Sequence, residues 1–179
     1  RTVALDAFYT GVRKTVMQPD EILIDIAFPA LPAQARGCYL KLGLRRAQAI
    51  SVLNCCVVLF RDQEQRVSDA RITLGAVAPT IIRAGEAEAA LRGNVLDDAL
   101  ITQAALLAQR AATPISDIRA SAAYRRDMVA VLVRRALRGS ADGGQTTVDG
   151  TLKTEDSRQP ATDELSSIIS PPSSVFRLL

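Results

Sequence analysis

The sequence changes its hydrophobic period once, and this change constrains the fold more than any other feature. Up to Val77, apolar and polar residues alternate in short runs separated by turn signals. Such alternation is typical of strands with one buried and one open face. After Gly85, apolar residues recur at three- and four-residue steps, as in amphipathic helices. Strands followed by helices predict an α+β fold with a helical layer on one face of a sheet.

Four segments are expected to form the strands: residues 21–28, the stretch that begins at Gly37, residues 50–61 and residues 66–77. The turns between them are short, which favours antiparallel pairing. We therefore predict an antiparallel sheet of three to four strands. The side chains expected to point inward from the last strand are Val67, Ala70, Ile72 and Leu74.

About three helices are expected to cover this sheet. The first spans residues 85–91 and ends at Gly93. The second opens at Asp97, a good N-cap residue, and is broken by Pro114. The third spans residues 120–138, with apolar residues on one side and arginines on the other.

The composition shifts after Gly139. Residues 140–179 are rich in Ser, Thr, Gly, Asp and Gln, which is typical of a disordered tail. The domain is accordingly expected over residues 1–139. The last six residues, 174–179, are compatible with a docking peptide or with an extension that has no function.

Several classes of function have little support. The chain has no histidine and three cysteines, so Ser-His and Cys-His catalysis is excluded and neither a metal site nor a catalytic residue is indicated. The basic residues occur in scattered pairs, which argues against nucleic-acid binding. No apolar run approaches the ~20 residues of a membrane span, and a cytoplasmic protein is expected. Because the chain opens inside an apparent strand, we also expect something to precede it.

A dense cationic patch interrupts the apolar runs between Gly37 and Leu53. Lys41, Arg45 and Arg46 lie within six residues, and Lys41 falls on the open face of its expected strand. Such a face is suited to an anion, because lysine supplies a mobile charge and arginine a planar fork. The alternative is a solvated strand edge whose charges discourage aggregation.

Five motifs, in unbroken order, resemble one known domain. The chain is similar to the C-terminal domain of the flavoprotein subunit of molybdenum hydroxylases, the family of carbon monoxide dehydrogenase medium subunits and xanthine dehydrogenases. The resemblance covers roughly residues 2–139. The motifs that carry it are Phe8-Tyr-Thr-Gly-x-Arg-Lys-Thr15, Pro19-x-Glu21-x-Leu23, Tyr39-x-Lys41-x-Gly43-x-Arg-Arg46-Ala-x-x-Ile50, Arg71-Ile-x-Leu-Gly75-x-Val-Ala-Pro79 and Ser116-Asp-x-Arg119-x-Ser-x-x-Tyr124-Arg125.

The resemblance implies an accessory domain that closes over FAD. The FAD would be shared with a preceding FAD-binding domain that this chain lacks. The molybdenum cofactor and the 2Fe–2S clusters would lie only on partners, a molybdenum-binding large subunit and an iron–sulfur subunit. Electrons would pass from the clusters to FAD and then to an acceptor. The chain is thus expected to be part of an oxidoreductase and to be inactive alone.

The resemblance also assigns cofactor-binding residues by position. Lys41 matches a lysine that contacts FAD, and Leu23 matches a leucine that packs near it. Arg46, next to Arg45, falls in a mobile loop beside the flavin. Some relatives have acidic residues after this arginine, whereas this chain has Ala47-Gln48-Ala49. The electron acceptor, NAD included, therefore cannot be inferred from those relatives. The alternative function is a non-catalytic α+β module that binds a protein partner.

Overall fold

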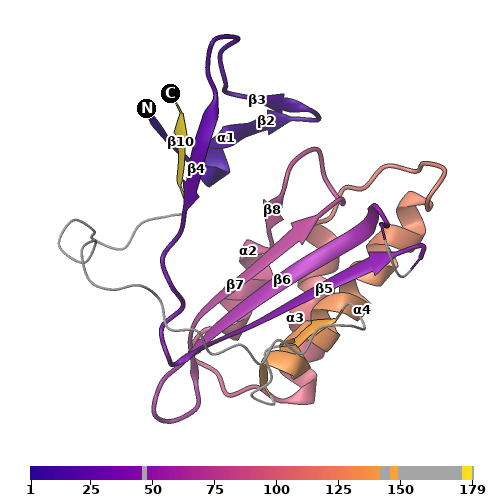
Figure 1. Cartoon of the computed structure of the whole chain (residues 1–179). Helices are drawn as coiled ribbons and strands as arrows, with labels where there is room; N and C mark the ends of the chain where they lie inside the picture. The colour runs from indigo at the N-terminus through magenta and orange to yellow at the C-terminus, as the bar shows by residue number, and fades with distance from the viewer. Residues whose placement is uncertain (46–47, 142–145, 149–174, 179) are drawn as a thin grey trace. The chain divides into compact units, whose positions relative to one another are not determined.

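The structure is a computed structural model that describes residues 1–45, 48–141, 146–148 and 175–178. The chain divides into two compact units (Figure 1). One comprises Arg1–Ala30 with Leu152–Leu179, and the other comprises Leu31–Thr151. The domain expected over residues 1–139 therefore spans parts of both units.

The larger unit, Leu31–Thr151, is built on an antiparallel sheet. Its central strands are β5 (Ala35–Gly43), β6 (Ser51–Arg61) and β7 (Val67–Gly75), and each pairs antiparallel with the next. Two short strands extend the sheet at its edges. The strand β8 (Ile82–Arg83) pairs antiparallel with β7, and β9 (Thr146–Val148) pairs parallel with β5.

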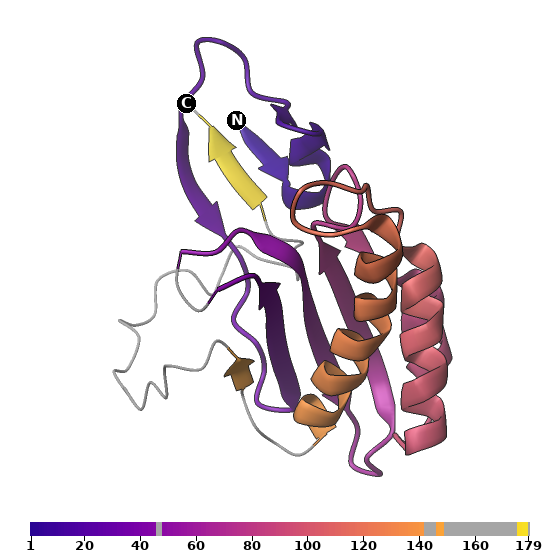
Figure 2. The same cartoon turned by 90° about the vertical axis from the view of Figure 1, so that its right-hand side faces the viewer.

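Three helices cover one face of this sheet, which confirms the predicted α+β arrangement (Figure 2). They are α2 (Gly85–Leu91), α3 (Asp98–Ala111) and α4 (Ala122–Ala141). The expected cap of α3 is present, because Asp97 accepts a hydrogen bond of 2.7 Å from the backbone N–H of Leu100.

The core lies between the helices and the sheet. The four side chains expected to point inward from β7 are all fully buried. They pack in one cluster with apolar residues of β5, β6 and the helices. The predicted inward side chains of β7 are therefore confirmed, with a period of two from Ala70 to Leu74. The members of this cluster with no exposed surface include Leu53, Cys55, Val57, Leu59, Leu91, Val129, Val133 and Leu137.

The first expected strand does not join this sheet. Within residues 21–28, β4 (Leu23–Ala27) forms, but it belongs to the smaller unit. There it lies in a three-stranded sheet of order β1-β10-β4, with β1 at Thr2–Ala4 and β10 at Val175–Leu178. The physical reason is that β5 already pairs with β6 on one edge and with β9 on the other. The other edge of β5 is thus covered at Cys38–Leu40, and β4 pairs with β10 instead.

The N-terminal segment of the smaller unit also contains compact local structure. It contains a single helical turn, α1 (Leu5–Phe8), and a hairpin of β2 (Tyr9–Gly11) and β3 (Lys14–Thr15). The hairpin turns at Arg13, whose φ is +55°. Phe8 is the buried centre of a cluster formed with Val3, Leu5, Val16, Met17 and Leu23.

Most of the segment expected to be a disordered tail, residues 140–179, lies outside the described residues. The exceptions are residues 140–141, which complete α4, and the two strands β9 and β10. Both of these strands pair with strands from the first quarter of the chain.

Candidate functional site

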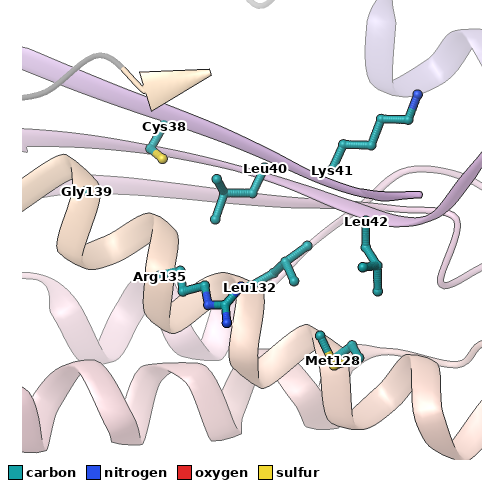
Figure 3. A pocket seen from close by; sticks show the side chains of 8 residues that line it. All are labelled: Cys38, Leu40, Lys41, Leu42, Met128, Leu132, Arg135 and Gly139. Carbon is teal, nitrogen blue, oxygen red and sulfur yellow. The ribbon is translucent and has the colours of Figure 1, made fainter. Parts of the chain in front are cut away.

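Lys41 lies on the open face of the larger unit's sheet. The side chains of Leu40 and Leu42 point from β5 towards α4, whereas that of Lys41 extends to the other side of the strand (Figure 3). Lys41 is exposed, and among the described residues no carboxylate forms an ion pair with it. The predicted alternation of β5 is confirmed up to Gly43, and it presents an uncompensated positive charge on the open face.

A polar row crosses the sheet beside Lys41. In the strand register, Lys41 of β5 pairs with Asn54 of β6, and Asn54 pairs with Gly75 of β7. A Cβ atom added to Gly75 would lie only 2.5 Å from Asn54 Oδ1. The amide of Asn54 therefore lies directly against the bare backbone of Gly75. The row combines one cation, one amide and one position without a side chain.

The loop after β5 is closed by Arg45. Its Nη2 donates a hydrogen bond of 2.9 Å to the backbone oxygen of Gln48, which adopts a left-handed conformation with φ +48°. A Cβ atom on Gly43 would approach Cβ of Ala49 to 2.9 Å, so the loop folds back tightly on the end of the strand. These contacts give Arg45 a structural role. Arg46 lies outside the described residues.

Leu23 lies in the other compact unit. It is the first residue of β4 and is partly buried against the cluster around Phe8. This packing accounts for its apolar character. The residues proposed for the cofactor site are thus distributed over two units, with Leu23 in one and both Lys41 and Arg45 in the other.

Burial keeps the ionisable side chains of Tyr39 and Cys55, at strand positions close to Lys41, in their neutral forms. Burial, together with Cys56 and Cys55, raises the pKa of Tyr39, which is 40% exposed beside Lys41. Burial is also the main cause that raises the pKa of Cys55 to about 12. Cys55 and Cys56 form no disulfide. Lys41 is therefore the charged member of the polar row formed with Asn54 and Gly75.

A cavity of about 210 Å³ lies behind β5, between this strand and α4 (Figure 3). Its walls are mostly apolar, with the guanidinium of Arg135 on the helix side. Lys41 contributes to the wall while its ammonium group points away from the cavity. The lining residues are Cys38, Leu40, Lys41, Leu42, Met128, Leu132, Arg135 and Gly139.

A buried arginine fixes the turn that follows Gly75. Arg125, only 4% exposed, donates through Nη1 to the backbone oxygen of Ala76 at 3.1 Å and through Nη2 to Asp117 Oδ1 at 2.6 Å. Ala76 has a left-handed φ of +62°, which a residue with a side chain adopts only when its surroundings hold it. Arg125 therefore supports the β7 end of the polar row from the helix side.

Asp117 is held as a carboxylate in this arrangement. Its Oδ1 also accepts from the backbone N–H of Arg119 at 2.8 Å and of Ala120 at 3.3 Å. The bond from Arg119 and the guanidinium of Arg125 lower the pKa of Asp117 well below its ordinary value. The motif that contains these residues thus anchors the last helix.

Asn54 is the residue of this site that the sequence analysis missed. It interrupts the apolar run from Val52 to Phe60, where it is the single amide among aliphatic, aromatic and cysteine side chains. This single amide in an apolar strand is the feature of the sequence that could have identified Asn54 as a site residue. Its placement next to Lys41 depends on the register of β5 and β6, which the residue pattern alone leaves open.

Metal clusters and membrane-spanning helices are both absent from the part of the chain that the structure describes. No group of three or more His, Cys, Asp or Glu side chains there could hold a metal ion. No described helix is long and apolar enough to cross a membrane.

Comparison with known proteins gives consistent matches. The family model for the CO dehydrogenase flavoprotein C-terminal domain matches residues 38–140. The chain is 31% identical over 137 residues to the carbon monoxide dehydrogenase medium chain of Hydrogenophaga pseudoflava, covering 76% of this chain and 47% of that protein. It is 32% identical over 137 residues to the nicotine 6-hydroxylase medium subunit of Paenarthrobacter nicotinovorans, with the same coverage.

A solved structure agrees with these matches. The quinoline 2-oxidoreductase of Pseudomonas putida 86 superposes with a TM-score of 0.73 at 28% identity, over 80% of this chain and 49% of that chain. The chain therefore spans about half the length of the relatives it matches. The family match includes β6, β7, α2 and α3 in full and most of β5 and α4. The chain belongs to the family of the CO dehydrogenase flavoprotein C-terminal domain, whose members include parts of the FAD-binding subunits of molybdenum hydroxylases.

Proposed function

We propose that this chain is the accessory domain of the flavoprotein component of a molybdenum-, iron–sulfur- and FAD-containing hydroxylase. In this role it closes over an FAD held mainly by a separate FAD-binding domain. It thereby supports electron transfer from iron–sulfur clusters to an acceptor. The observation that carries the proposal is Lys41, an exposed cation without an acidic partner among the described residues, on the open face of a domain of this family.

The residues on the open face fit one part of FAD. The edge of the flavin ring carries oxygen and nitrogen acceptors, and Lys41 and Asn54 supply donor groups side by side. Gly75 is buried beneath the Asn54 amide, so its missing side chain makes room for this amide and leaves the contact with a flat group to Asn54. We propose Lys41 as the principal contact and Asn54 as a second one. Leu23, Arg45 and Arg46 remain candidate contacts.

The same residues do not fit the other end of FAD. A pyrophosphate is usually bound by several backbone N–H groups at a glycine-rich turn between a strand and a helix, and the sequence has no such turn. The family relatives are about twice as long as the part that this chain matches. The proposal therefore places the phosphate-binding groups in a separate domain.

Lys41 would tune the cofactor by its charge. Bound FAD supplies the redox chemistry, in which the ring accepts electrons and passes them to an acceptor. A nearby ammonium group favours the negative charge that the ring gains on reduction. The three strands around Lys41 are rigidly paired, so its backbone is fixed while its ammonium group reaches the open face.

The partners follow from the same proposal. The similar proteins are named as medium chains and subunits, and a solved relative is a Cu,Mo-CO dehydrogenase. We propose that an iron–sulfur subunit and a molybdenum-binding large subunit complete the enzyme, and that they carry the 2Fe–2S clusters and the molybdenum cofactor. Substrate would then be selected on the large subunit, away from this chain.

Titration of FAD into the purified chain, followed by flavin fluorescence, tests whether this chain depends on a separate domain to bind FAD. Charge-assisted contacts at an open site each contribute about 1 kcal/mol, which does not offset the several kcal/mol lost in immobilising so large a ligand. We expect a colourless protein that binds FAD more weakly than roughly 0.1 mM. A complete medium subunit of a relative serves as the positive control. Micromolar binding by this chain alone would show that the proposal assigns the main FAD-binding groups to the wrong domain.

A further inference from the structure

The smaller unit contains a sheet whose middle strand comes from the other end of the chain. Strand β10 (Val175–Leu178) lies between β1 (Thr2–Ala4) and β4 (Leu23–Ala27) and pairs antiparallel with both. In the register, Phe176 is opposite Val3 on one side and Ile26 on the other.

The two outer strands do not pair with each other. Because both are antiparallel to β10, they run parallel to one another. Neighbouring strands lie about 4.8 Å apart, so β1 and β4 are separated by about two such spacings. Without a middle strand, their facing edges would each present unpaired N–H and C=O groups. The two strands therefore form a slot one strand wide.

The walls of the slot are also joined by contacts that do not involve β10. The segment from β1 to β4 includes α1 and the β2–β3 hairpin, and Phe8 packs there against Val3 and Leu23. Arg1 also donates to Glu21 at 2.8 Å and to the backbone oxygen of Val16 at 2.8 Å, which ties the start of β1 to the start of β4. These contacts hold the two edges in place around the middle strand.

We propose that the slot between β1 and β4 is a strand-binding site, and that the chain's own C-terminal segment occupies it by main-chain pairing. This is the β-augmentation mode of recognition, in which an extended peptide completes an open sheet. Main-chain pairing is sequence-tolerant, so the site accepts an extended, mainly apolar peptide supplied from outside when the C-terminal segment is removed from it. The proposal is independent of the FAD role.

The attachment of β10 to the rest of the chain favours β10 over a free peptide in the slot. A tethered segment acts at an effective concentration that reaches the millimolar range for flexible linkers. A free peptide of the same sequence must therefore compete with the attached copy. It binds well only when the attached copy is disabled.

A backbone substitution in the full-length chain tests this directly. Arg177→Pro removes one main-chain donor from β10, and in a middle strand each N–H group faces a partner strand. Arg177→Ala removes the same side chain and keeps the donor, which makes it the matched control. The probe is a fluorescently labelled peptide of residues 173–179, and binding is followed by anisotropy.

We expect the peptide to bind the Arg177→Pro chain at least tenfold more tightly than the wild-type or the Arg177→Ala chain. A peptide that carries the same proline should not bind any of them. Equal binding to all three chains, or no binding to the Arg177→Pro chain, would overturn the proposal. A wild-type chain that dimerises, and becomes monomeric on Arg177→Pro, would also overturn it by placing β10 in a second copy.

Hydrogen exchange keeps the test decisive if the variant folds poorly. In the Arg177→Pro chain, amides of residues 2–4 and 23–27 should exchange faster, and addition of the peptide should restore their protection. Amides of β6 and β7 should not change. Unaltered exchange at residues 2–4 and 23–27 would show that β10 does not occupy the slot.

Discussion

The two faces of the β5–β6–β7 sheet are made by the same three strands, yet they differ in what explains them. On the helix-covered face, fully buried side chains such as Leu53, Val57 and Ile72 pack against α2, α3 and α4. On the open face, Lys41 has no acidic partner among the described residues, and Asn54 lies against a bare glycine. Packing accounts for the first face. For the second we propose a group that the chain binds from outside.

The largest effect is expected on the covered face. Ile72→Ala removes three buried carbons, and such a change typically costs 2–5 kcal/mol of the free energy of unfolding, so we expect about 3 kcal/mol. The matched control is its neighbour on the open face, Arg71→Ala, for which we expect less than about 1 kcal/mol. Urea unfolding followed by circular dichroism measures both. Equal losses of unfolding free energy in the two variants would show that the two faces do not differ in their contribution to stability.

A smaller loss of stability is expected when Arg125, which connects the helical layer to the turn after β7, is replaced. Arg125→Met leaves Asp117 without its buried partner and the turn at Ala76 without a donor. We expect the melting temperature to fall by about 5 °C. Arg126→Met, at the exposed neighbouring position of α4, should leave it nearly unchanged. If the Arg125→Met chain melts at the same temperature as wild type, this arginine is not needed to hold the turn.

The close approach of Asn54 and Gly75 gives a third test. Gly75→Ala places a Cβ against the Asn54 amide, which we expect to cost about 1 kcal/mol. In an Asn54→Ala background the same change should cost nothing or stabilise the chain slightly, because alanine restricts the unfolded state more than glycine does. A double-mutant cycle on unfolding free energies measures the coupling. Additive effects would mean that the two residues do not touch.

The pH dependence of stability should reveal the carboxylate of Asp117. Its pKa is lower in the folded chain than in the unfolded chain, so its contribution is present above about pH 4 and is lost as the pH falls towards the folded value. Asp117→Asn should therefore lower the melting temperature at pH 7 by more than at pH 3. A difference from wild type that stays constant between these pH values would contradict this account.

The sequence predicts the larger unit well because its signals are local. The helix over residues 85–91, the cap at Asp97 and the inward face of β7 each follow from residues a few positions apart. The pairing of β4 with β10 could not be predicted, since main-chain hydrogen bonds between distant segments leave no residue pattern. For the site, Lys41 could be identified from its alternation, whereas Asn54 depends on the register between strands.

The most direct test of the central claim is the flavin reduction potential of the complete enzyme with Lys41→Met. Loss of one charge near the ring should cost on the order of 1 kcal/mol, which for a two-electron couple corresponds to about 20 mV. We expect the potential to fall by roughly this amount, or FAD retention to weaken, while the molybdenum half-reaction is nearly intact. Arg71→Met, which removes a cation from the same face at a distance from Lys41, serves as the control and should leave the potential unchanged. If potential, FAD content and turnover of the Lys41→Met enzyme all match wild type, Lys41 does not lie beside the flavin.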